Sequence, residues 1–300
     1  MRAAIEKAGD IYLSAEADDS PAAQAADIAS LVSKGAKTII VVVADPQSIL
    51  PAVRQASSAH VAVITYDRPI ESPDVLYVGY DDIEAGRMMG AALMAVKPAG
   101  AYAFIRGRKD DLRSGLMFSG VMESLQPAMT AGKVKSAGEA LVEDWSPGGA
   151  MTATQDMLGR TGSKIDAVAA ESDAMAGGVV AALSAQALAG AVAVSGVGGD
   201  HASINRVALG TQAISVWEDR SDLGRNAGEA AVALATGKKP KEINGAKPFS
   251  ISPKGAKLEA VLLPPVAVTR DTLGIVVDRG WMTKAQICSG VKPGATPFCG

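Results

Sequence analysis

The feature that most constrains this chain is a regular alternation of short, β-branched apolar runs with longer helical patterns. Runs such as 37–44 (KTIIVVVA) are apolar on both faces and do not alternate with polar residues. Strands of this kind need helices over both sides, which is the arrangement of a parallel sheet in an α/β fold. The candidate strands are 10–17, 37–44, 61–67, 75–81, 101–107, 134–141, 165–172, 192–198, 213–219 and 259–268.

Helical patterns fill the segments between these strands. The segment 21–35 opens on a proline, which suits a first helical turn, and closes on a glycine, which suits a helix end. The segment 173–190 is predicted as another helix, with Asp173 in the capping position and Gly190 at its end. The chain opens on the last two turns of a helix that ends at Gly9. A doubly wound domain begins with a strand, so we expect a late start, with the first strand and any signal peptide missing for the same reason.

Breaks in the alternation predict that the chain passes between two domains three times. The strand 75–81 follows the strand 61–67 without a helix between them. Similar breaks fall at 213–219 and at Pro264–Pro265, since prolines are incompatible with a central strand. We therefore expect an α/β protein of two doubly wound parallel-sheet lobes joined by three hinge strands, the first lobe from 1–81 plus 219–262 and the second from 82–218 plus 263–300.

Composition and charge exclude several classes of partner. Hydrophobic residues make up 48% and charged residues 20% of the 300 residues, which is typical of a packed globular protein. The net charge of −3 gives no electrostatic reason to expect nucleic acid or an anionic membrane. No apolar run reaches the roughly 18 residues that span a bilayer. The polar segment 236–250 is expected to be a surface excursion and not a domain boundary.

Motifs for chemistry are scarce. The sequence contains no phosphate-binding glycine loop, nucleophile elbow or metalloprotease helix motif. Histidine occurs only at His60 and His201, which argues against a His-based catalytic pair or metal cluster. We therefore expect no enzymatic activity, no metal and no cofactor.

Two cysteines lie in a Gly/Pro-rich tail, where turns can bring them together. A disulfide between Cys288 and Cys299 would staple the C-terminus and would indicate an oxidising compartment. The alternative is a pair of free thiols in a cytosolic protein. We expect the disulfide, because closely spaced cysteines confined to a terminal tail have little other role.

Polar side chains follow many of the candidate strands. In open α/β sheets ligands bind outside the carboxyl ends of the strands. Carboxylates, Arg guanidinium groups and a tryptophan suit a sugar, whose hydroxyls take bidentate hydrogen bonds and whose CH face packs on an indole. Asp173 and Asp200 are alternatively helix caps, and Trp217 is alternatively a core residue. Asp67 and Arg68 are alternatively a structural ion pair at the end of a strand. The residues at these ends are Asp67, Arg68, Asp110, Asp111, Arg113, Trp145, Glu171, Ser172, Asp173, Gly198, Gly199, Asp200, Trp217, Glu218 and Asp219.

Three runs carry a family resemblance: "VITYDRPI…YVGYDDIEAGRMMGAAL", "KIDAVAAESDAMAGGVVAALSAQALAG" and "AVAVSGVGGDHASINRVALGTQAISVW". Together they resemble the periplasmic sugar-binding proteins of ABC importers, in particular those that bind xylose. The resemblance implies two hinged lobes that close on a monosaccharide, xylose or a related pentose. It further implies a periplasmic monomer without enzymatic activity, which hands its sugar to a permease in the inner membrane.

The resemblance also assigns roles to residues. Asp67 and Arg68 match the acid–base pair that grips the sugar from the first lobe. Asp111 matches an acid of the second lobe, and Trp145 matches the tryptophan that stacks on the sugar ring.

Other positions depart from the family pattern. Arg113 and Ser172 stand where the family has asparagines, and Gly198 stands where it has an aspartate. In the family a lysine follows an aromatic residue at this point. Trp217 stands at the aromatic position, and Glu218 takes the place of the lysine. A different sugar, or a degenerate paralogue with an altered ligand, is therefore an alternative. A sugar-sensing regulatory domain is a further alternative, since sugar-responsive repressors share the two-lobe core. A nucleotide-dependent enzyme is disfavoured by the missing motifs.

Overall fold

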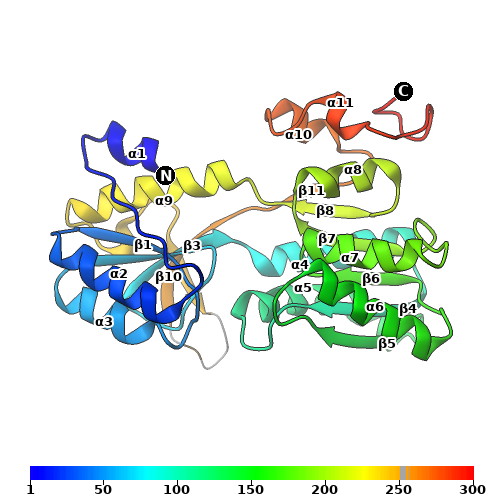
Figure 1. Cartoon of the computed structure of the whole chain (residues 1–300), viewed down its shortest axis with the longest axis horizontal. Helices are drawn as coiled ribbons and strands as arrows, with labels where there is room; N and C mark the ends of the chain where they lie inside the picture. The colour runs from blue at the N-terminus through cyan, green and yellow to red at the C-terminus, as the bar shows by residue number, and fades with distance from the viewer. Residues whose placement is uncertain (251–254, 256) are drawn as a thin grey trace. The chain divides into compact units, whose positions relative to one another are not determined.

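The computed structural model describes residues 1–250, 255 and 257–300. The chain separates into two compact units, one formed by Met1–Asp81 with Asp219–Pro264 and the other by Asp82–Glu218 with Pro265–Gly300 (Figure 1). Each unit holds a mainly parallel sheet with helices on both faces, which confirms the predicted α/β class.

The first unit is built around a sheet in the order β1-β2-β3-β10-β9. Pairing is parallel from β1 through β10, and β9 runs antiparallel to β10 at the edge. Helices α2 and α3 pack on one face, and α9 packs on the other. The elements are α1 (Arg2–Lys7), α2 (Pro21–Ser33), β1 (Thr38–Val42), α3 (Leu50–Ser58), β2 (Ala62–Tyr66), β3 (Val75–Tyr80), α9 (Arg220–Ala235), a 3-10 turn (Pro240–Glu242), β9 (Lys247–Ser250) and β10 (Lys257–Leu263).

The second unit has a sheet in the order β11-β8-β7-β6-β4-β5. The pairs from β8 to β5 are parallel, and β11 runs antiparallel to β8. The elements are α4 (Asp82–Val96), β4 (Gly100–Arg106), α5 (Leu112–Thr130), β5 (Val134–Leu141), α6 (Pro147–Thr161), β6 (Ala167–Ala170), α7 (Asp173–Ser184), β7 (Ala193–Gly198), α8 (His201–Leu209), β8 (Ile214–Trp217), β11 (Val266–Val268), α10 (Gly274–Asp278) and α11 (Lys284–Ile287).

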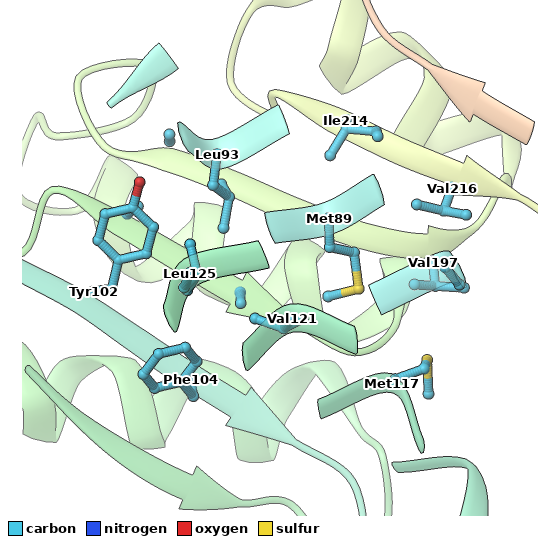
Figure 2. Packing of buried hydrophobic residues seen from close by; sticks show 14 of the residues in the cluster. Met89, Leu93, Tyr102, Phe104, Met117, Val121, Leu125, Val197, Ile214 and Val216 are labelled. Carbon is cyan, nitrogen blue, oxygen red and sulfur yellow. The ribbon is translucent and has the colours of Figure 1, made fainter. Parts of the chain in front are cut away.

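Two apolar layers cover the sheet of the second unit. On one face, Met89 of α4 and Met117 and Leu125 of α5 pack against the strands (Figure 2). On the other face, α6 and α7 contribute residues such as Leu158 and Val179. With both faces closed by helices, the carboxyl ends of the strands are where polar side chains can gather without entering the core.

The C-terminal segment forms a small cap on the second unit. Helices α10 and α11 pack with α8 in a cluster that includes Trp217 and Val276. Cys288 and Cys299 form the predicted disulfide, with their Cα atoms 5.6 Å apart. Among the described residues, no helix combines the length and the apolar character needed to cross a membrane.

The predicted strand over 10–17 is wrong. These residues are irregular, and the side chains of Ile11 and Leu13 are 86% and 51% exposed. The segment has the alternating pattern of a strand, but no neighbouring strand pairs with it among the described residues. A single strand without a ladder or a packed face is not stable in water.

Two further element predictions need correction. The helix predicted for 173–190 ends at Ser184, so Gly190 does not close it. Its N-cap is Ser172, and Asp173 is instead the first helical residue. The segment 259–268 is divided by its two prolines into β10 and β11, which belong to different sheets. The polar segment 236–250 is largely exposed and lies within the first unit, as predicted, and its β9 extends the first sheet by antiparallel pairing.

Candidate functional site

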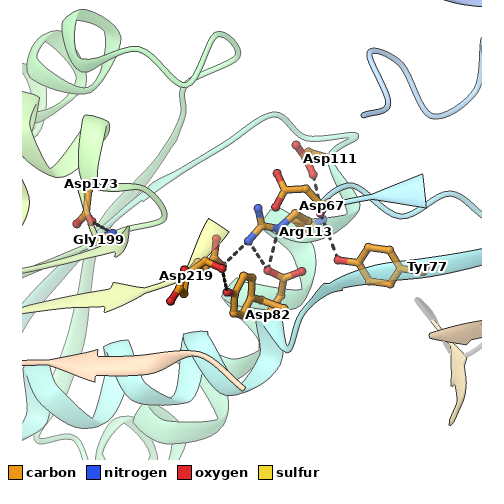
Figure 3. A network of polar contacts seen from close by, with 10 residues as sticks. Asp67, Tyr77, Asp82, Asp111, Arg113, Asp173, Gly199 and Asp219 are labelled. Carbon is orange, nitrogen blue, oxygen red and sulfur yellow. Dashed lines mark hydrogen bonds and ion pairs between the residues drawn. The ribbon is translucent and has the colours of Figure 1, made fainter. Parts of the chain in front are cut away.

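Asp67 and Arg68 stand at the carboxyl end of β2 in the first unit. Asp67 has a positive φ of 67°, a conformation that Asp tolerates better than most residues. Its N–H donates to the carbonyl of Val78 (3.0 Å), and the Tyr77 hydroxyl donates to its carbonyl (3.2 Å; Figure 3). The Arg68 Nη1 donates to the carbonyl of Val43, 3.2 Å away beyond the end of β1. The backbone therefore fixes this acid–base pair at the end of the sheet.

Asp111 begins α5 in the second unit. Its carboxylate accepts a hydrogen bond from the backbone N–H of Arg113 at 3.0 Å, as an N-cap does. The positive end of a helix stabilises a carboxylate at this position. The residue is half-buried, and a carboxylate has a second oxygen that can accept a further hydrogen bond.

Trp145 lies in the loop between β5 and α6. Its φ of 54° is positive, and its indole lies directly on Gly107, where an added Cβ would come within 1.9 Å of Cζ2. The glycine is therefore required for the ring to lie there. The indole Nε1 is buried and has no hydrogen-bond partner among the described residues. The residue is half-buried, and an indole face is suited to a ligand that has an apolar face.

Arg113 is held by two carboxylates of its own unit. Its Nε and Nη2 donate to Asp82 Oδ1 at 2.8 and 2.7 Å, and Nη2 lies 2.6 Å from Glu218 Oε1 (Figure 3). The Arg113, Asp82 and Glu218 side chains are 13%, 1% and 4% exposed. Asp82 and Glu218 are the first and last residues of the longer of the two segments that form this unit. Two residues predicted to contact the ligand are thus paired with each other.

The other predicted residues have structural contacts in the second unit. Ser172 accepts from the backbone N–H of Met175 at 3.2 Å and caps α7. Gly198 ends β7 with a φ of 133°, a conformation that favours glycine. Trp217 is 1% exposed and packs against Trp281, with 6.3 Å between the ring centroids, so it has the core position that the sequence left open.

Asp173 forms a buried polar network that sequence reasoning missed. It is 2% exposed, and its carboxylate accepts from Gly199 N (2.6 Å), Ser215 Oγ (2.5 Å) and Gln212 Nε2 (2.7 Å). Burial raises the pKa of the Asp173 carboxyl, although these three hydrogen bonds act to lower it. The network holds the loop after β7 against β8. Asp200, by contrast, is the expected helix cap, since it accepts from Ser203 N at the start of α8.

Glu171 is a second buried carboxyl, at the end of β6. Its Oε2 accepts from Gly107 N (2.8 Å) and Ser114 Oγ (2.5 Å), and its Oε1 lies 3.5 Å from Arg106 Nε. Burial raises the pKa of Glu171 to about 7, against the lowering effect of these two hydrogen bonds and of Arg106. Its place after a strand put it among the sequence candidates, but no pattern in the sequence indicated that it is buried.

This raised pKa predicts a specific dependence of stability on pH. Because the folded pKa of Glu171 lies above the ordinary 4.5, the folded state binds more protons than the unfolded chain between that value and about 7. The unfolding free energy therefore falls as the pH rises through this window, by on the order of 2 kcal/mol. Urea unfolding of the wild type and of Glu171→Gln at about pH 5 and pH 8 checks this. The change in unfolding free energy between the two pH values should be larger in the wild type, and the difference between the two proteins is due to Glu171. An equal change in both proteins would contradict the prediction.

Within each unit, the structure brings some of the predicted residues together. In the first unit it places Asp67 and Arg68 at one end of the sheet. In the second it gathers residues of the β4, β6 and β8 ends around the start of α5, among them Glu171, together with the unpredicted Asp82 at the start of α4. Within the described part of the chain, no group of three or more His, Cys, Asp or Glu side chains is placed to hold a metal ion.

Two α/β units linked by three chain crossings, each with polar side chains at its strand ends, define a two-lobe binding protein. The chain belongs to the periplasmic binding protein family, whose domain matches residues 1–239. It is 35% identical over 219 residues to the D-xylose-binding periplasmic protein of Escherichia coli (strain K12), a match that covers 73% of this chain and 66% of that protein, just under two thirds. It is 32% identical over 280 residues to the D-xylose-binding periplasmic protein of Haemophilus influenzae, covering 91% and 81% of the two chains.

A solved structure supports the same fold. A carbohydrate transporter solute-binding protein from Chloroflexus aurantiacus, in complex with D-glucose, matches with a TM-score of 0.83 at 24% identity. The match covers 95% of this chain and 91% of that chain. At this identity the likeness shows the fold alone, and it confirms the predicted two-lobe architecture.

Proposed function

We propose that this chain is the solute-binding component of a sugar ABC transporter and that it binds a monosaccharide, xylose or a related pentose. The observation that carries the proposal is the set of residues at the strand ends: Asp67 and Arg68 in one unit, Asp111 and Trp145 in the other. Carboxylates and a guanidinium group can bind sugar hydroxyls in pairs, and an indole face packs on the CH face of the ring. The two D-xylose-binding relatives support the choice of ligand class.

The proposed mechanism is binding and release without a covalent step. In the first unit the acid–base pair offers groups for sugar hydroxyls. In the second unit Asp111 offers a carboxylate and Trp145 offers an indole face. The bound sugar then passes unchanged to an ABC permease, which is the proposed partner, and the protein acts as a monomer. The disulfide between Cys288 and Cys299 supports an extracytoplasmic location, because disulfides persist in oxidising compartments.

For five other residues, ligand contact remains a prediction from the family resemblance. Their structural contacts argue for supporting roles: Arg113 and Glu218 pair with each other, Ser172 caps a helix, Trp217 is buried, and Gly198 ends a strand. The charge that Arg113 could offer a ligand is compensated by the carboxylates beside it. The proposed direct contacts are therefore the four residues named above.

A thermal melt with millimolar pentoses, hexoses and polyols tests the proposal. A ligand at about 100 times its dissociation constant stabilises the native state by about 2.7 kcal/mol, which raises the melting midpoint by a few degrees. We expect one monosaccharide, a pentose, to produce this shift while a disaccharide of the same sugar does not. A cooperative melt that no monosaccharide moves would count against the proposed function while leaving the fold intact.

A further inference from the structure

Glu171 is a buried carboxyl in the second unit and is not one of the proposed ligand contacts. It follows β6 at the carboxyl end of the sheet and is 3% exposed. Its backbone N–H donates to the carbonyl of Ile105 in β4 at 3.1 Å. Both its backbone and its side chain are therefore fixed by the sheet.

The Glu171 side chain joins two elements that follow one another along the chain. Oε2 accepts from the backbone N–H of Gly107, directly after β4, and from the hydroxyl of Ser114 in the first turn of α5. The carboxylate thus fixes both sides of the loop that runs from the strand to the helix. A buried acceptor with two donors of this kind is costly to remove, because each donor is left without a partner.

Each of these two donors lies beside a proposed ligand contact. The indole of Trp145 lies on Gly107, at a distance that no side chain at that position would allow. Ser114 is three residues after Asp111, in the helix turn that Asp111 caps. The Trp145 ring and the Asp111 carboxylate come from different loops. Glu171 is hydrogen-bonded both to Gly107, on which the ring lies, and to Ser114, in the turn that Asp111 caps.

The charges around Glu171 come from three elements. Arg106 of β4 lies 3.5 Å from Oε1 and is also paired with Glu139 of β5, 2.7 Å from its Nη1. Asp111, the N-cap of α5, acts in the opposite sense and raises the pKa of Glu171. Protonation of Oε1 would still leave Oε2 able to accept from Gly107 and Ser114. Glu171 therefore connects Gly107 and Ser114 through its hydrogen bonds and does not need its negative charge to do so.

We infer that Glu171 is a positioning residue for ligand binding: through Gly107 and Ser114 it fixes the support of Trp145 and the helix turn that carries Asp111. This inference rests on the proposed function, since it names a residue that shapes the same site without contacting the ligand. It predicts that affinity follows the hydrogen-bonding ability of residue 171 and is insensitive to its charge.

Titration of the monosaccharide found in the melts into three variants tests this inference. Glu171→Ala should weaken binding about tenfold or more, which corresponds to 1.4 kcal/mol or more. Glu171→Gln keeps a side-chain oxygen and should stay within about threefold of the wild type. Glu139→Gln, at a 41% exposed partner of Arg106, is the matched control and should bind as the wild type does. Unchanged binding by Glu171→Ala, or an equal loss in Glu171→Gln, would overturn the inference.

A second measurement does not depend on any sugar. The chain has 3 tryptophans, so the indole N–H signals in a proton–nitrogen NMR spectrum can be assigned with single Trp→Phe variants. The Trp145 signal should move in Glu171→Ala and keep its position in Glu171→Gln. An unmoved signal in Glu171→Ala would overturn the inference, whether or not the wild type binds a sugar. A moved signal in a protein that binds no sugar would count against the proposed function alone. If Glu171→Ala does not fold, Ser114→Ala removes one donor and must move the same signal.

Discussion

Replacing Arg113 by methionine is expected to lower the free energy of unfolding by about 3–5 kcal/mol. The substitution keeps the volume of the side chain but leaves Asp82 and Glu218, 1% and 4% exposed, as buried carboxylates without their shared cation. Taking a charge out of water costs several kcal/mol, and the guanidinium group between them is what offsets this cost. The loss should therefore far exceed that of a surface ion pair.

Urea unfolding measures this effect against a control from the same unit. Arg87 also has two carboxylate partners, Glu84 and Glu123, but the three side chains are 45%, 41% and 50% exposed. Arg87→Met should therefore cost no more than about 1 kcal/mol. Combining Arg113→Met with Asp82→Asn and Glu218→Gln should recover much of the loss, because the buried charges are then gone. Equal, small losses for the two arginine substitutions would contradict the role of the triad.

Replacing Asp173 by alanine is expected to cost about 3 kcal/mol or more. The substitution leaves three donors, Gly199 N, Ser215 Oγ and Gln212 Nε2, without their acceptor inside the second unit. Hydrogen bonds to charged groups contribute about 1.5–3 kcal/mol each, and their losses do not simply add. The stability of the variant is again measured by urea unfolding.

Asp200 is the matched control for this substitution. It is an ordinary N-cap, whose carboxylate accepts from Ser203 N at 2.6 Å, and Asp200→Ala should cost about 1 kcal/mol. Sequence reasoning treated the two aspartates alike, as caps. If both substitutions cost the same, the distinction that the structure draws between them does not hold.

The fold could be predicted from the sequence wherever a strand is apolar on both faces. Runs such as Val75–Tyr80 and Ala167–Ala170, which are buried along their whole length, have few alternatives to a covered parallel sheet, and the paired prolines signal a change of sheet. The failed strand over 10–17 shows the limit. Its pattern is that of a strand, but a strand also needs a partner, and a partner depends on tertiary structure that local pattern does not contain.

The site was harder to predict than the fold, for a related reason. The rule that ligands bind at the carboxyl ends of strands selected the loops that carry the proposed contacts. It could not show that Arg113 pairs with Asp82 and Glu218, which lie 31 and 105 residues away in the sequence. Nor could it separate a half-buried aspartate that can face a ligand from a fully buried one such as Asp173. Burial and pairing decide which polar residues are available, and both follow from packing.

The central claim is that a monosaccharide binds to the charged strand ends and to Trp145. Calorimetric titration of the purified chain with D-xylose and then with other pentoses tests it most directly, with Trp145→Ala and Asp67→Asn titrated beside the wild type. We predict saturable binding of one pentose to the wild type and a loss of at least about tenfold in affinity for each variant, since each removes a direct contact. A folded wild type that binds no monosaccharide, or variants that bind as tightly as the wild type, would contradict the account.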